Sequence, residues 1–90
     1  MAKKILYSRT FLKNYRKRII RYSKISKRFD ERLYLFAEDV NNPILKDHKL
    51  IGVKSDLRAF SITGDIRVIY KNISKDTVMF LDVGTHNQIY

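Results

Sequence analysis

The spacing of the apolar residues changes at Pro43, and this change restricts the fold of the chain more than any other feature. Before Pro43, apolar side chains recur about every 3.6 residues, the period of a helix that buries one face. After Pro43 they alternate with a period of about 2, as in a strand with one buried face. The sequence therefore predicts a helical first half followed by a sheet.

Two helices are predicted before the proline. The first follows the candidate capping residues Ser8 and Thr10. Its apolar face consists of Phe11, Tyr15, Ile19 and Tyr22. The second helix is expected to begin after Ser26, with Asp30 and Glu31 in its first turn, where the helix dipole favours acids. Its apolar face consists of Phe29, Leu33, Phe36, Ala37 and Val40.

Strands are predicted at residues 4–7, 57–62, 66–70 and 77–83. Short polar turns join the last three, so these neighbours must run antiparallel. Leu50 and Ile51 either add a short strand or only lead into the sheet. The predicted fold is a single α+β domain covering residues 1–90. Two N-terminal helices pack on one face of a small twisted antiparallel sheet in the order β-α-α-β-β-β.

The net charge of +10 comes from the N-terminal third. Residues 1–28 contain eleven lysines and arginines and no acid, whereas residues 29–90 contain eight basic and nine acidic residues. Such a field attracts polyanions and speeds their association, although a charged helix face is usually only solvated. The positions expected to contact a polyanion are Lys13, Arg16, Lys17, Arg21 and Lys24.

Composition argues against several classes of protein and site. The absence of cysteine excludes disulfides and thiolate metal sites and fits a reducing cytoplasm. No apolar run approaches the roughly 20 residues that span a membrane, and no secretory signal follows the basic N-terminus. The histidines and glycines show no ligand or phosphate-loop spacing. We therefore expect a cytoplasmic protein with no metal, no cofactor and no membrane partner.

The only two histidines, His48 and His86, are the candidate proton-transfer groups. Histidine exchanges protons most readily near neutral pH, and in so basic a chain this points to acid–base chemistry on an anion. Asp65 is a further candidate, and two of the three residues also have a purely structural explanation. His48 could be a loop histidine bonded to a neighbour, and Asp65, after Gly64, fits an ordinary turn.

Four segments together resemble the toxins of the RelE/ParE superfamily, most closely the YafQ-type mRNA interferases. They are residues 47–52 (DHKLIG), 57–65 (LRAFSITGD), 68–71 (VIYK) and 84–87 (GTHN). The resemblance implies a ribosome-dependent, metal-independent endoribonuclease of a type II toxin–antitoxin system. In such an enzyme a base activates the ribose 2′-OH, the oxygen attacks the neighbouring phosphorus, and an acid protonates the departing 5′-oxygen.

The resemblance also implies roles for particular residues. His48, Asp65 and His86 match catalytic positions of the YafQ-type motif, and Tyr90 matches an aromatic residue that could stack on a base. Arg58 and Lys49 are further candidates for cations that bind the substrate and stabilise the charge of the transition state.

Three positions depart from the motif. It commonly has a histidine where Ser61 stands, an aromatic residue where Ile66 stands and a basic residue where Asp82 stands. These departures leave two alternatives open. One is a ParE-like toxin that inhibits DNA gyrase without cutting RNA, and the other is a catalytically weakened module that binds nucleic acid through its charge.

The partners implied by the resemblance are a cognate acidic antitoxin, mRNA in the ribosomal A site, and rRNA contacted through the basic helices. Contact with DNA would occur only through the complex with the antitoxin.

Overall fold

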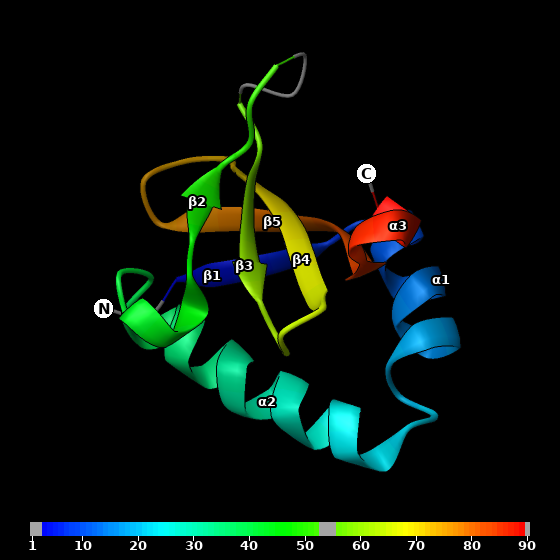
Figure 1. Ribbon diagram of the computed structural model, residues 1–90. Helices are drawn as coiled ribbons and strands as arrows, with labels where there is room; N and C mark the ends of the chain where they lie inside the picture. Colours follow the sequence, from blue (N-terminus) through cyan, green and yellow to red (C-terminus); the bar gives the residue numbers. More distant parts are fainter. Residues whose placement is uncertain (1–2, 53–55, 90) are drawn as a thin grey trace.

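The computed structural model describes residues 3–52 and 56–89 (Figure 1). The elements in chain order are β1 (Lys4–Tyr7), α1 (Arg9–Arg18), α2 (Ser23–Glu38), the 3-10 helix η1 (Pro43–Leu45), β2 (His48–Lys49), β3 (Arg58–Ser61), β4 (Ile66–Asn72), β5 (Thr77–Thr85) and α3 (His86–Ile89). The five strands form one sheet in the order β1-β5-β4-β3-β2. The predicted α+β class, with two N-terminal helices packed on a small sheet, is confirmed.

The sheet is mixed, not wholly antiparallel as predicted, because β1 pairs parallel with β5. The other strand pairs are antiparallel, and short turns join β3 to β4 and β4 to β5, as their spacing requires. The connection from β1 to β5 contains both helices and the strands β2, β3 and β4, and only a long connection lets two strands of a chain pair in parallel. The additional strand, β2, forms at His48–Lys49, just before Leu50 and Ile51.

α1 begins as predicted but ends earlier. The Oγ of Ser8 accepts a hydrogen bond from the Phe11 N–H at 3.0 Å, whereas Thr10 lies inside the helix. The helix ends at Arg18, so Tyr22 lies beyond it and is 50% exposed instead of being part of the packed face. The members of the predicted face that do pack are Phe11, Tyr15 and Ile19.

α2 begins at Ser23, earlier than predicted. The N–H of Ser26 already makes a helical hydrogen bond, and Ile25 packs against the core. Burial of Ile25 therefore favours the earlier start, although no side chain caps the helix there. Asp30 and Glu31 consequently lie in the middle of the helix, and the prediction that they occupy its first turn is wrong.

Phe80 on β5 is the centre of the aromatic core. Its ring lies with centroids 5.4–6.4 Å from those of Tyr7, Phe11, Phe36, Phe60 and Tyr70. Because α1 and α2 both reach this one side chain, both helices cover the same face of the sheet. The predicted packing roles of Phe11, Phe29 and Phe36 are confirmed, since all three are buried.

The register of the strands defines a second face. Side chains alternate along a strand, and directly opposite residues point to the same side. Because Phe60 and Tyr70 face the helices, their neighbours point away from them. We call this side the second face, and it carries His48, Ala59, Ser61, Arg67, Ile69, Asp82 and Gly84.

A buried polar network holds β2 against the sheet. The Asp47 side chain is only 7% exposed and lies 2.5 Å from Nη2 of Arg58. The Nε of Arg58 donates to the same carboxylate at 2.7 Å, and the hydroxyl of Tyr70 donates to its other oxygen. The bond to Asp47 raises the pKa of Arg58, and burial, followed by the bond to Asp47, raises the pKa of Tyr70. The network therefore joins the segment before His48 to β3 and β4.

We expect Arg58→Gln to lower the free energy of unfolding by about 2–3 kcal/mol, because it leaves a buried carboxylate without its cation. Urea unfolding followed by circular dichroism measures this loss. The control is Arg28→Gln, since Arg28 pairs with Glu31 at 3.5 Å on the exposed surface and should contribute less than about 1 kcal/mol. Equal losses in the two variants would contradict a stabilising role for the network.

We also expect stability to fall at high pH through Tyr70. The pKa of its hydroxyl is raised in the folded chain above the value of about 10 expected when unfolded. The neutral phenol therefore contributes stability that is fully present below pH of about 10 and is lost as the pH rises through the folded pKa. Unfolding at neutral and at alkaline pH should show a smaller decline for Tyr70→Phe than for the wild type. Parallel declines would refute this linkage.

Candidate active site

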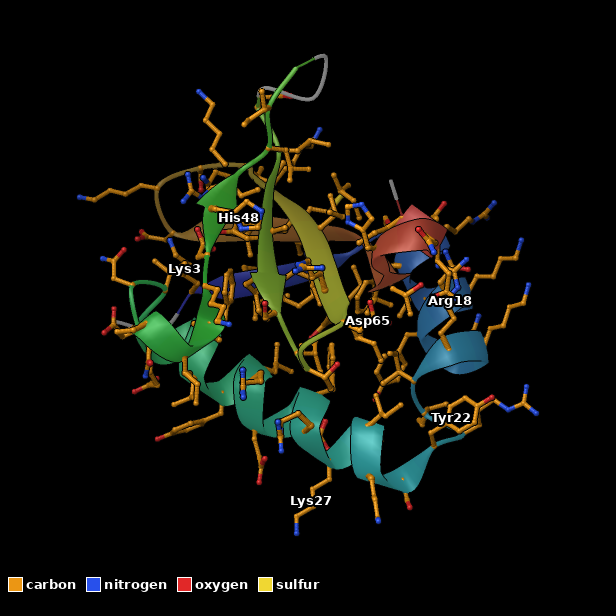
Figure 2. All side chains as sticks on the ribbon, viewed as in Figure 1. Lys3, Arg18, Tyr22, Lys27, His48 and Asp65 are labelled. Atoms are coloured by element: carbon orange, nitrogen blue, oxygen red, sulfur yellow. The ribbon has the colours of Figure 1, made fainter. Side chains whose placement is uncertain are left out.

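The three predicted catalytic residues come from three different elements, and all are exposed. His48 lies on the edge strand β2, Asp65 in the turn between β3 and β4, and His86 at the first position of α3. Figure 2 shows His48 and Asp65 at separate positions across the sheet. The register decides which of the three are brought together.

Asp65 and His86 are brought to the same end of the sheet. Ile66 on β4 lies directly opposite Thr85 on β5. In an antiparallel pair, the next residue outward on each strand is again a neighbour. Asp65 precedes Ile66 and His86 follows Thr85, so the chain passes through both residues at the same end of the sheet.

Gly84 permits the turn that presents His86. A Cβ atom at this position would lie 2.7 Å from Oε1 of Gln88 and 2.8 Å from Nη1 of Arg18. The same Gln88 oxygen accepts a hydrogen bond from the Thr85 N–H at 2.7 Å. A side chain at position 84 would therefore displace the ends of Gln88 and Arg18 and would press on Cβ of Gln88, which would lie 3.1 Å away.

His48 is oriented by a backbone carbonyl. Its Nδ1 lies 2.9 Å from the carbonyl oxygen of Lys46, and a carbonyl only accepts, so Nδ1 carries the proton. In the neutral ring the lone pair then lies on Nε2, which is the atom able to take up a proton. Lys46 has a left-handed backbone with φ of 50°, and it directs this carbonyl from the end of η1.

His48 stands apart from the other two residues. It lies on the second face in line with Ala59 and Ile69, and Asp65, just before β4, is four residues from Ile69 in the chain. Four residues of strand span about 13 Å. His48 and Asp65 are therefore well separated along the sheet.

The two predicted substrate-binding cations lie on the other side of the sheet from His48. Lys49 and Arg58 are directly opposite each other, and Arg58 is opposite Tyr70 on the face that the helices cover. The guanidinium of Arg58 is bound to Asp47. This contact indicates that Arg58 positions β2.

Asp82 is bound to α1 and does not present a bare charge. Its Oδ1 accepts hydrogen bonds from Asn14 at 2.7 Å and from the Val83 N–H at 2.8 Å. The same oxygen lies 3.6 Å from Nη1 of Arg18. The carboxylate thus serves to attach α1 to β5, and its charge is compensated locally.

Arg67 is a candidate that the sequence did not reveal. It lies on the second face, directly opposite Ser61 on β3 and Gly84 on β5. Ser61 itself is buried. The only signal in the sequence is an arginine at an outward position within a β-branched strand, which is also typical of ordinary solvated strand residues.

The predicted basic surface reaches the neighbourhood of His86. Its members Lys13, Arg16, Lys17, Arg21 and Lys24 are all exposed and lie on α1, the following loop and the start of α2. A pocket of about 440 Å³ lies between this surface and α3, and its lining includes Lys17, Arg18, Arg21, Thr85 and Gln88. Figure 2 shows Arg18 on α1 beside α3.

Tyr90 lies outside the described residues. Within residues 3–52 and 56–89, no group of three or more histidine, cysteine, aspartate or glutamate side chains could hold a metal ion. No helix in the described part of the chain has the length and apolarity needed to cross a membrane.

Comparison with known proteins identifies relatives of this chain. Residues 3–90 match the family model described as the bacterial toxin of type II toxin–antitoxin system, YafQ. No curated protein matches significantly.

Solved structures of toxins share the fold. In the E. coli DinJ-YafQ toxin–antitoxin complex, a chain with 21% identity aligns over 100% of this chain and 99% of its own length, with a TM-score of 0.76. A copper-bound mutant toxin from Helicobacter pylori has 22% identity over the full length of both chains and a TM-score of 0.73. The YoeB/ParE toxin from Agrobacterium tumefaciens has 13% identity over 92% of this chain and 98% of that one, with a TM-score of 0.76.

The match to the family model extends over nearly the whole sequence and includes every element of the fold. The chain therefore belongs to the YafQ family of toxins of bacterial type II toxin–antitoxin systems.

Proposed function

We propose that this toxin is a ribosome-dependent endoribonuclease that cleaves mRNA by metal-independent acid–base catalysis. The observation that supports the proposal is the pairing of Ile66 with Thr85, because the next residues along the chain, Asp65 and His86, leave the sheet at the same end. His48, with its Nδ1 bonded to a carbonyl, supplies a second imidazole on the second face. Cleavage of a phosphodiester by its own 2′-OH requires two proton-transfer groups, each within hydrogen-bond reach of its own oxygen atom.

His48 is the proposed general base. Its Nε2 removes the proton from the ribose 2′-OH, and the 2′-oxygen forms a bond to the adjacent phosphorus. His86 is the proposed general acid, and it gives a proton to the 5′-oxygen as the phosphorus–oxygen bond breaks. Asp65, as the neighbouring carboxylate, stabilises the charged imidazole of His86. The products are a 2′,3′-cyclic phosphate and a free 5′-hydroxyl.

The basic surface would hold the toxin on the ribosome. Its cations are exposed on two helices and the loop between them, where they can bind rRNA phosphates while the second face approaches mRNA in the A site. In this role the toxin works in the cytoplasm. Tyr90 would stack on a base of the message, and Lys49 would add a cation near the edge strand.

The proposed protein partner is a cognate antitoxin with an acidic segment that folds onto the toxin. The net charge of +10 on this chain favours binding of an acidic segment. Structures of the related DinJ-YafQ toxin–antitoxin complex support an antitoxin as the partner. DNA would be contacted only by the toxin–antitoxin complex.

Conservative replacement of the histidines tests the mechanism. His86→Gln is expected to reduce the rate of mRNA cleavage by a factor of about 10²–10⁴, the usual contribution of a general acid or base, and His48→Gln should cause a loss in the same range. The measurement is primer extension on a defined message translated by purified ribosomes. Lys75→Gln, at an exposed site between β4 and β5, is the control and should cleave at the wild-type rate.

Unchanged mRNA with wild-type toxin on translating ribosomes would reject the proposal. A supercoiling assay with DNA gyrase should then be made with the same preparation. Inhibition of gyrase, equally strong in His86→Gln, would favour the ParE-like alternative, to which the departures at Ser61 and Ile66 point. Salt-sensitive RNA binding without cleavage or inhibition of gyrase would favour the charge-driven module.

A further inference from the structure

A small pocket outside the predicted basic surface collects four positive charges. It has a volume of about 220 Å³ and lies between α2, η1 and the turn that joins β3 to β4. Its charged lining residues are Arg28, Arg32, Lys46 and Arg67. Among the described residues, no acidic side chain lines it. Cations crowded into a concave site repel one another and focus a positive potential, and both effects favour a bound anion.

Arg32 is the fixed member of this pocket. Its Nη1 donates to the carbonyl oxygen of Ile44 at 3.0 Å and lies 3.4 Å from that of Ser61. These acceptors are neutral, so they orient the guanidinium without cancelling its charge. Arg28 is 3.5 Å from Glu31 in an exposed pair, which screens it only weakly.

Hydroxyl groups complete the lining. Thr63 and Ser61 both line the pocket, and Ser61 is buried. The Oγ1 of Thr63 accepts hydrogen bonds from the N–H groups of Asp65 and Ile66. Its own hydroxyl proton therefore remains to be donated. Arginine forks with nearby hydroxyl donors suit the tetrahedral oxygens of a phosphate.

The pocket adjoins both ends of the proposed active site. Lys46 lines it and also provides the carbonyl that orients His48. Gly64 lines it and immediately precedes Asp65. Arg67 connects it to the second face, because this residue lies opposite Ser61. The short serine at the position where the motif commonly has a histidine leaves space beside Arg67.

We propose that this pocket binds a phosphate group of the RNA strand next to the bond that is cut. The inference rests on the proposed function and adds a site to it. Arg67 and Lys46 contact the phosphate oxygens, and Arg32 forms the fixed back of the pocket. The strand is thereby held by a neighbouring phosphate while the scissile group lies over the second face.

The test measures binding of a short oligoribonucleotide with 2′-O-methyl groups, which cannot be cut, to the purified toxin by fluorescence anisotropy over a range of salt. Arg67→Gln and Lys46→Gln should each bind about tenfold more weakly at low salt. Each should also reduce the slope of log K against log salt by about 0.7, the contribution of one phosphate contact to a single strand. The conservative variant Arg67→Lys keeps the charge and should recover most of the slope. A variant that had lost binding only because it was misfolded would not recover it.

The matched controls each remove one positive charge far from the pocket. They are Arg9→Gln at the start of α1 and Lys75→Gln between β4 and β5, both at exposed positions. If the pocket variants lose no more affinity and slope than these controls, the proposal is wrong. Titration with inorganic phosphate should shift the backbone amide resonances of Thr63 and Gly64 in the wild type but not in Arg67→Gln, and unmoved wild-type amides would overturn it.

These outcomes are separate from those of the proposed function, because no cleavage is involved. An all-DNA oligonucleotide of the same sequence should lose the same slope in Arg67→Gln, as expected for a site that contacts only phosphate. If Arg67→Gln lowers the slope for neither oligonucleotide, the proposed phosphate site is rejected even if the wild-type toxin cleaves mRNA. A slope loss in both supports the pocket even if His86→Gln cleaves at the wild-type rate.

Discussion

The rest of the structure depends on the packing of aromatic side chains around the ring of Phe80. It packs against aromatic rings from β1, α1, α2, β3 and β4, so one side chain connects nearly every element to β5. A chain of 90 residues has a thin core, and large aromatic groups bury much area for each residue used. This packing brings both helices onto one face of the sheet.

The polar contacts then fix what the aromatic core leaves undetermined. Asp47 binds Arg58 and Tyr70 and thereby attaches β2 at the edge of the sheet. Asp82 binds Asn14 and lies near Arg18 at the opposite side, where β1 no longer covers β5. Each carboxylate is compensated where it lies, so the acids in the sheet do not cancel the positive charge available to a polyanion.

The structure divides that positive charge into two parts with different surroundings. The cations of the predicted basic surface are solvated on the helices, where they attract a polyanion from a distance. Those around the small pocket converge from α2, η1 and β4 beside Ser61 and Gly64, where a single phosphate can be held in a defined place.

Much of the fold and part of the site follow from the sequence. Strand β1, the cap at Ser8, the buried faces of Phe29 and Phe36, and the turns of the second half depend on local periodicity and turn chemistry, which act within a few residues. The uneven charge and the candidacy of His48, Asp65 and His86 are also visible without coordinates. The start of α2 was not visible in the sequence, because packing of Ile25 overrides the capping signal.

Only the tertiary structure decided which distant residues meet. The parallel pairing of β1 with β5, the attachment of Arg58 to Asp47 and the convergence of Arg32, Lys46 and Arg67 join positions far apart in the chain. No local pattern encodes such pairs, because they depend on the strand register and on the side of the sheet to which each residue points. The sequence by itself determined the elements, the charge and the candidate chemistry. The register, set by the packed core, determined that Ile66 pairs with Thr85 and that Arg58 lies on the other side of the sheet from His48.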